Sequence, residues 1–142
     1  MPFQIGRAIF CGFLATSALT TIMLANWISG LLPQIDLVRV LQGLFPINPA
    51  IGFATHVLIG SLLLGPIFGL VKGILPGSTN TVKGIAFGLM VWLACSPVTG
   101  YALLTERATI GAMLVTVVYF VAFGATLGWL WGELVTNEPE TE

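Results

Sequence analysis

The chain has 142 residues, of which 56% are hydrophobic and 8% charged, and its formal net charge is -1. Soluble domains carry a charge on about a quarter of their residues, so this composition excludes a water-soluble globular protein. It predicts a single integral membrane domain over residues 1–142. The basic residues are scattered singly, which excludes a groove for nucleic acid. They are Arg7, Arg39, Lys72, Lys83 and Arg107.

Four apolar runs are long enough to cross the hydrocarbon core of a bilayer, which is about 30 Å thick. They cover approximately residues 8–32, 50–75, 84–104 and 109–134. Each run is predicted to be a helix, because backbone groups in lipid must pair within their own segment and four strands cannot close a membrane barrel. The predicted fold class is therefore all-α, a multi-pass bundle of four transmembrane helices.

The segments outside the spans are short. Residues 34–45, between two prolines, place their apolar side chains near one helical face, which predicts a short helix lying in the membrane interface. Residues 135–142 form a polar, acidic tail. An even number of spans puts both termini on one side of the membrane. That side carries Arg7, Lys72 and Lys83, against two basic residues opposite, which favours cytoplasmic termini.

Small residues recur at every fourth position within the spans. The glycines in this pattern are Gly12, Gly65, Gly69, Gly73, Gly84, Gly88, Gly124, Gly128 and Gly132. Such residues lie on one helical face and allow another backbone to approach closely, where dispersion replaces the hydrophobic drive that lipid removes. This pattern, a glycine zipper, predicts close packing within one bundle. Packing against partner helices is the alternative interpretation.

The sequence also contains an internal repeat. An offset of 59 positions brings Gly52, Gly65, Gly69 and Gly73 onto Gly111, Gly124, Gly128 and Gly132. A second offset of 76 positions brings Arg7, Ile9 and Gly12 onto Lys83, Ile85 and Gly88. These matches predict two helical hairpins that arose by duplication.

His56 is the only histidine and lies about 9 Å inside the predicted second span. By the rise of about 1.5 Å per residue, it shares its depth with Asn26, Ser96 and Thr99, and these four residues form a candidate polar site. The rotation of about 100° per residue predicts that His56 lies about 180° around the helix from Gly65. It is therefore predicted to face away from the packing face, unless a kink near Pro66 turns the two halves of the helix relative to each other.

An ionisable side chain inside a membrane is a functional candidate by default. The imidazole of His56 can form a hydrogen bond, relay a proton or ligate a haem. The chain has no second histidine to complete a ligand set, so a metal at His56 would require ligands from a partner, and no metal or cofactor is predicted. The plainest interpretation is a neutral, hydrogen-bonding histidine.

The sequence contains no serine–histidine–aspartate set, no paired carboxylates and no phosphate loop. The only acidic residues near a span, Asp36, Glu106 and Glu133, lie at span ends. No enzyme activity and no catalytic residue are therefore predicted.

Residues 83–100, KGIAFGLMVWLACSPVTG, together with the four spans and the early histidine of span two, resemble small four-helix bacterial inner-membrane proteins of the YagU-like kind. The resemblance implies a bacterial inner membrane and implies no activity.

Three functions remain open from the sequence. The first is a non-catalytic accessory or structural subunit of a larger membrane complex, such as a respiratory or other energy-transducing one. The second is a homo-oligomeric channel or transporter for a small solute. The third is contact with a haem or a quinone through His56. The predicted partners are the lipid bilayer and either other membrane subunits or further copies of the chain.

Overall fold

The computed structural model describes residues 5–31, 48–105 and 110–136. Over these residues the chain is helical with short turns and contains no strand, which confirms the predicted all-α class. The elements are α1 (Ile5–Ser29), α3 (Pro49–Leu58), η1 (Ile59–Leu64), α4 (Gly65–Val71), α5 (Asn80–Thr105), α6 (Ile110–Trp131) and η2 (Gly132–Thr136). The predicted interfacial helix 34–45 and residues 137–142 of the acidic tail lie outside the described residues.

Three helical segments are long and apolar enough to cross a membrane. They are Ile5–Asn26, Ala54–Val71 and Ile110–Leu134. Helix α5, which contains the predicted span 84–104, is not among them within the described part of the chain. The structure therefore supports three of the four predicted spans.

The turn between α4 and α5 is longer than the sequence predicted. The second span ends at Val71 rather than near residue 75. Pro76 keeps the helix from resuming in the turn, because it lacks an amide donor and disfavours helical geometry in the residue before it. Helix α5 starts at Asn80, before the predicted residue 84. Its first turn is capped by Thr79, whose hydroxyl accepts a hydrogen bond from the Val82 amide at 3.2 Å.

Elements α3, η1 and α4 follow one another without a break and form one long helix, α3–η1–α4. Its middle segment, η1, is a π-helix in which the Gly65 amide bonds to the Gly60 carbonyl, five residues earlier. Pro66 explains its position, since the proline has no amide for the Leu62 carbonyl and its ring presses against that carbonyl. The wider π turn relieves this clash and inserts one extra residue.

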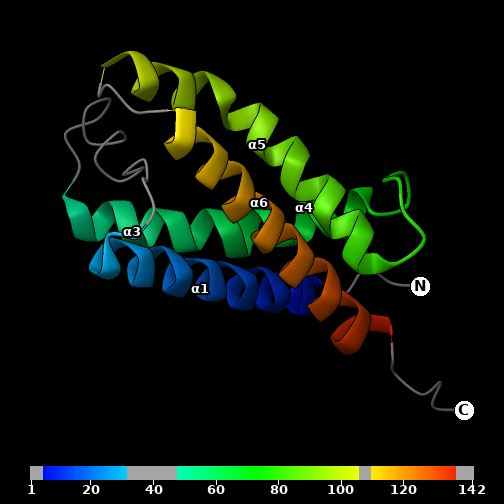
Figure 1. Ribbon diagram of the computed structural model, residues 1–142. Helices are drawn as coiled ribbons and strands as arrows, with labels where there is room; N and C mark the ends of the chain where they lie inside the picture. The colour runs from blue at the N-terminus through cyan, green and yellow to red at the C-terminus, as the bar shows by residue number, and fades with distance from the viewer. Residues whose placement is uncertain (1–4, 32–47, 106–109, 137–142) are drawn as a thin grey trace, which may run out of the picture.

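The helices form two antiparallel pairs (Figure 1). The first pair is α1 with α3–η1–α4, and the second pair is α5 with α6. The pairs are joined mainly where α1 packs on α6, whereas α5 and the α3–η1 segment do not pack extensively on each other. This leaves a gap between α5 and the α3–η1 segment on one side of the bundle.

An aromatic cluster closes one end of this gap. The ring of Phe68 lies 5.4 Å from that of Phe87 and 5.6 Å from that of Trp131, measured between centroids. All three side chains are buried, so the cluster joins α4, α5 and α6 near the end that carries the start of α1. At the end of the chain, η2 continues the last helix to Thr136, so residues 135 and 136 of the predicted tail are helical.

Candidate functional site

The first helix pair is held together at a backbone-to-backbone contact of small residues. A Cβ atom on Gly65 would overlap the carbonyl oxygen of Ala8 and lie 3.2 Å from the Cα of Gly12. A Cβ atom on Gly12 would lie 2.6 Å from the carbonyl oxygen of Gly60. Only glycine fits at these crossings, since the obstacle is backbone rather than a side chain that can rotate away.

The second pair uses the same arrangement. Cβ atoms on Gly84 and Gly124 would each overlap the carbonyl oxygen of the other residue. A Cβ atom on Gly88 would overlap the Phe120 carbonyl, and one on Gly128 would overlap the carbonyl of Asn80. Such close approach suits Cα–H···O contacts between the helices.

The contacts of the two pairs are equivalent under the sequence repeat. The offset of 76 positions carries Ala8 and Gly12 onto Gly84 and Gly88, and the offset of 59 carries Gly65 onto Gly124. Gly65 lies against Ala8 and Gly12 in the first pair, and Gly124 lies against Gly84 and Gly88 in the second pair. Before η1 the offset becomes 60, because the π turn separates Gly60 from Gly65 by five positions whereas the equivalent Phe120 and Gly124 are four positions apart.

Two of the predicted packing glycines lie outside these close contacts. A Cβ atom on Gly73 would meet nothing within 4 Å, and one on Gly132 would come no closer than 3.6 Å, to the side-chain amide of Asn80. Gly69 is half-buried in α4. The side-chain position of Gly52, at the start of the repeat, lies outside the described residues.

The π turn also changes where His56 points. The prediction that His56 faces away from the packing face is wrong, because it assumed α-helical rotation as far as Gly65. With one extra residue in the turn, His56 and Gly60 fall on the same side of the helix as Gly65, facing the rest of the bundle. A Cβ atom on Gly60 would meet the side chain of Thr16 on α1, which fixes this orientation.

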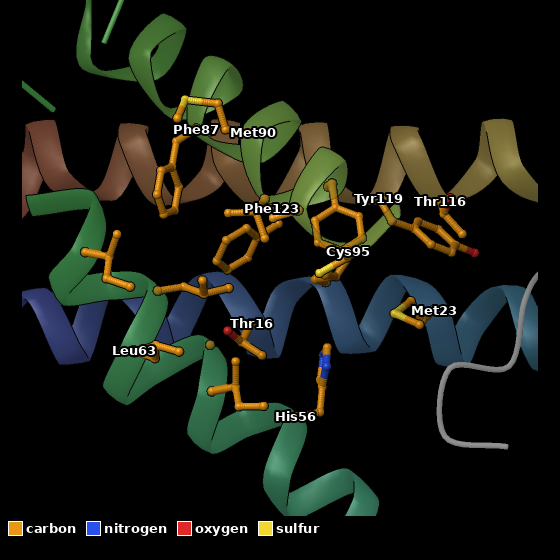
Figure 2. Close-up of a pocket in the computed structure, with 18 of the residues that line it drawn as sticks. Thr16, Met23, His56, Leu63, Phe87, Met90, Cys95, Thr116, Tyr119 and Phe123 are labelled. Atoms are coloured by element: carbon orange, nitrogen blue, oxygen red, sulfur yellow. The ribbon is translucent and has the colours of Figure 1, made fainter. Parts of the chain in front are cut away.

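His56 lines a cavity of about 560 Å³ between the two helix pairs (Figure 2). This volume is in the range of small-molecule sites. All four long helices contribute side chains. Those labelled in the figure are Thr16 and Met23 of α1, His56 and Leu63 of α3–η1–α4, Phe87, Met90 and Cys95 of α5, and Thr116, Tyr119 and Phe123 of α6.

The cavity wall is almost entirely apolar, and its polar groups differ in their hydrogen bonding. The hydroxyl of Thr16 donates to the Gly12 carbonyl at 2.7 Å, and that of Thr116 donates to the Met113 carbonyl at 2.7 Å. His56 is half-buried, and its Nε2 atom is buried without a hydrogen-bond partner among the described residues. The imidazole therefore presents a buried nitrogen with unused hydrogen-bonding capacity to the cavity.

The second pair shows how the equivalent position is satisfied. Thr116 lies 60 positions after His56, which is the offset that applies before the π turn, and Trp92 lies 76 positions after Thr16. The indole Nε1 of Trp92 donates to the Thr116 hydroxyl at 3.2 Å. In the second helix pair, the two polar side chains at these positions therefore bond to each other. In the first helix pair, His56 Nε2 has no hydrogen-bond partner among the described residues and lies at the cavity.

Of the four residues of the predicted polar site, His56 lines the cavity, whereas Asn26 and Ser96 do not. The side-chain amide of Asn26 donates to the Tyr119 hydroxyl at 2.9 Å, which links α1 to α6. Ser96 is half-buried in α5 and is not part of the cavity wall, and the side chain of Thr99 lies outside the described residues.

Sequence reasoning missed the residues that accompany His56 instead. Thr116 and Tyr119 sit one turn apart on α6, but a single span gives no indication of which helix faces which. Their three-residue spacing of polar side chains within an apolar helix was the available signal.

Within the described part of the chain, no group of three or more histidine, cysteine, aspartate or glutamate residues gathers to hold a metal ion. Cys11 and Cys95 are both free thiols and lie on different helices, α1 and α5. The cavity therefore offers one imidazole and a thiol in an apolar wall, which suits a neutral organic ligand better than a metal ion.

The fold and the site together define a class: all-helical proteins with apolar helices able to cross a membrane and a cavity between two glycine-packed helix pairs. The chain belongs to a family described as "Family of unknown function (DUF6789)", which matches residues 3–142. No curated protein and no solved structure matches it.

Proposed function

We propose that this protein is a non-catalytic, four-span membrane protein that binds a quinone within the bilayer, in the cavity between its two helix pairs. The observation that carries the proposal is the buried, unpartnered Nε2 of His56 in the wall of an apolar cavity of about 560 Å³. The proposal develops the third function left open by the sequence.

A fourth span through α5 is part of this proposal. Helix α5 has 26 residues, which correspond to about 39 Å, more than the hydrocarbon thickness of about 30 Å. Lys83, in its first turn, is its only charged residue. Its glycine contacts hold α5 side by side with α6. Because α6 is itself long and apolar enough to cross a membrane, this packing favours a crossing by α5 next to it, in the opposite direction.

The chemistry of the wall favours a quinone over a lipid chain or a haem. A quinone has a flat ring, an apolar tail and carbonyl oxygens that accept a hydrogen bond from neutral imidazole. The aromatic side chains of Phe87, Phe120 and Phe123 offer faces and edges for such a ring. A saturated acyl chain would leave His56 without a partner, and a haem would draw only one histidine ligand from this chain.

The gap between α5 and α3–η1 gives the ligand a route into the cavity. Because these segments do not pack extensively on each other, the cavity opens sideways from the bundle, toward the hydrocarbon region if all four helices span. A quinone dissolved in the bilayer then enters without crossing a polar surface. Met90 and Leu63 line the gap and are exposed on the bundle, and the unbranched side chain of Met90 can adapt to a passing ligand.

For the membrane and the orientation of the protein, we propose what the sequence predicted. Both termini lie in the cytoplasm, and the membrane is a bacterial inner membrane. Support for the orientation comes from Arg7 and Lys72, which lie at the same end of the bundle, where α6 ends. Equivalent glycine contacts in the two pairs support duplication of one ancestral helical hairpin. The accessory-subunit, channel and YagU-like interpretations stay predictions.

Binding can be measured on the full chain purified in mild detergent. A short-tailed benzoquinone is titrated, and quenching of tryptophan fluorescence is followed, because Trp92 bonds to the cavity residue Thr116. We expect His56→Leu to weaken binding about 3- to 30-fold, the equivalent of one intramembrane hydrogen bond of about 0.6–2 kcal/mol. Ala94→Phe, which fills the cavity, should abolish it. The matched control is Thr126→Val, because that hydroxyl bonds only to the Ala122 carbonyl of its own helix.

Two outcomes would overturn the proposal. One is equal quinone affinity in wild type, His56→Leu and Ala94→Phe. The other is a purified wild-type protein with a Soret absorption band that is lost in His56→Leu, which would assign the histidine to haem. Co-purification of other membrane subunits would instead support the accessory role.

A further inference from the structure

A second feature, independent of the cavity, lies at the end of the bundle that carries the start of α1. Lys72 follows the spanning segment Ala54–Val71 directly, and Lys83 lies in the first turn of α5. The turn between α4 and α5 brings these two residues to the same end. At the end of a span, their ammonium groups are at the level of lipid headgroups.

The position of Lys72 is fixed by an aromatic ring. Its Nζ atom lies 5.0 Å from the centroid of the Trp131 ring, a cation–π contact, and the Trp131 side chain is only 2% exposed. The lysine stem therefore lies along the bundle while its charge is held at the surface. Tryptophan is the residue type typical of this depth in a membrane protein.

Lys72 and Lys83 lie close enough to repel each other. Partial burial, and secondly the positive charge of Lys83, lower the pKa of Lys72. Among the described residues, neither lysine forms an ion pair with a carboxylate. The pair is thus a local excess of positive charge, and an anion placed between the two ammonium groups would remove their repulsion.

We propose that Lys72 and Lys83 bind the phosphate of an anionic phospholipid headgroup. The membrane supplies this anion at the required depth, with its acyl chains lying along the apolar surfaces of α4 and α5. Leu70 and Ile74, beside Lys72, are 69% and 85% exposed and would contact such chains. The cytoplasmic leaflet carries the anionic lipids, which fits the proposed cytoplasmic location of this end.

Arg7 is at the same end but has a different role. Its Nη1 atom donates to the carbonyl oxygen of Leu134 at 3.3 Å, so the guanidinium binds the end of the last helix. It adds to the positive field without being required as a direct ligand. Its replacement should weaken lipid binding less than replacement of either lysine.

The experiment uses the full chain in a neutral detergent, with native mass spectrometry to count bound lipids. Phosphatidylglycerol is added in one arm, phosphatidylcholine in a second and inorganic phosphate in a third. We expect selective binding of phosphatidylglycerol, and a loss of about fivefold in affinity for each lysine removed, in Lys72→Gln and in Lys83→Gln. Lys72→Arg keeps the charge and the contact with Trp131, and should retain binding. The affinity should fall as salt is raised.

Three results would overturn the inference: equal affinity for the two lipids, unchanged phosphatidylglycerol affinity in both glutamine variants, and saturation of the site by inorganic phosphate alone. The thermal midpoint of each variant in lipid-free detergent shows whether it is folded. If a glutamine variant unfolds, the lipid affinity of Lys72→Arg and the salt dependence of the wild type test whether the two lysines bind the phosphate. A variant that combines Glu138→Gln, Glu140→Gln and Glu142→Gln tests whether the chain's own acidic tail binds the two lysines. If that change destabilises the lipid-free protein as much as the lysine variants do, the pair belongs to the tail.

Discussion

The close contact between α5 and α6 can be tested by adding one methyl group. A Cβ atom on Gly124 would overlap the Gly84 carbonyl oxygen and lie 3.0 Å from the Gly88 amide nitrogen. A comfortable C···O separation is about 3.3–3.6 Å, so Gly124→Ala must move the helix backbones apart by something on the order of 1 Å. No side-chain rotation can relieve this overlap, because every obstacle belongs to the backbone.

The size of the effect follows from two opposing contributions. Overpacking costs about 1–3 kcal/mol, and a backbone obstacle places Gly124→Ala at the upper end of that range. Alanine has a higher helix propensity than glycine, which returns up to about 1 kcal/mol. The free energy of unfolding should therefore fall by about 2 kcal/mol. Lipid cannot compensate, because separated helices lose dispersion contacts without any hydrophobic drive to restore them.

Gly132→Ala is the matched control on the same chain segment. Its new methyl group would lie 3.6 Å from the Asn80 side-chain amide, an ordinary contact, so stability should stay the same or rise slightly. Both variants are unfolded by titration with sodium dodecyl sulfate in mixed micelles, followed by circular dichroism. Equal stability of the two variants, or a more stable Gly124→Ala, would refute the backbone-contact reasoning.

Three further predictions concern other contacts. Gly60→Ala should destabilise the first pair, because its Cβ atom would overlap the Thr16 hydroxyl. Thr16→Ala should rescue part of the loss, because it removes the hydroxyl and the methyl group but leaves the Cβ atom of residue 16 at 2.9 Å; no rescue in the same titration would argue against that contact. Tyr119→Phe should cost about 1 kcal/mol of unfolding free energy by removing the Asn26 hydrogen bond, and an unchanged midpoint would show that the bond contributes nothing. A fluorescent protein fused after Glu142 should be bright, as expected in the cytoplasm, whereas a periplasmic phosphatase fused there should be inactive; the reverse pattern would invert the topology.

Much of the fold could be predicted from the sequence because the evidence for it is local. Apolar runs and the absence of internal charges predict membrane helices wherever backbone groups must pair within a segment. The positions of Gly84 and Gly88, and of Gly124 and Gly128, identified helix faces suited to close packing. The repeat offsets also predicted that the two helix pairs are equivalent. The reason is that a close backbone contact requires a small residue, so equivalent contacts in the two pairs place small residues at equivalent sequence positions.

The sequence pattern did not distinguish glycines at crossings from glycines at the ends. Gly132 continues the spacing of Gly124 and Gly128 but lies past the crossing, where the chains have already separated. Spacing along one helix determines which residues share a face. The angle at which two helices cross determines how far along that face the contact continues, and this angle depends on both partners.

The orientation of His56 and the cavity were decided only by the tertiary structure. A regular α-helix turns His56 away from Gly65, and the π turn ahead of Pro66 returns it to the interior by inserting one residue. The sequence contained the proline but not the way in which its clash would be relieved. The cavity depends on a non-local fact as well: α1 packs on α6, so α5 and α3–η1 are held apart above them. Composition and periodicity determined that these helices form, whereas side-chain packing between distant segments determined which faces meet and where space remains.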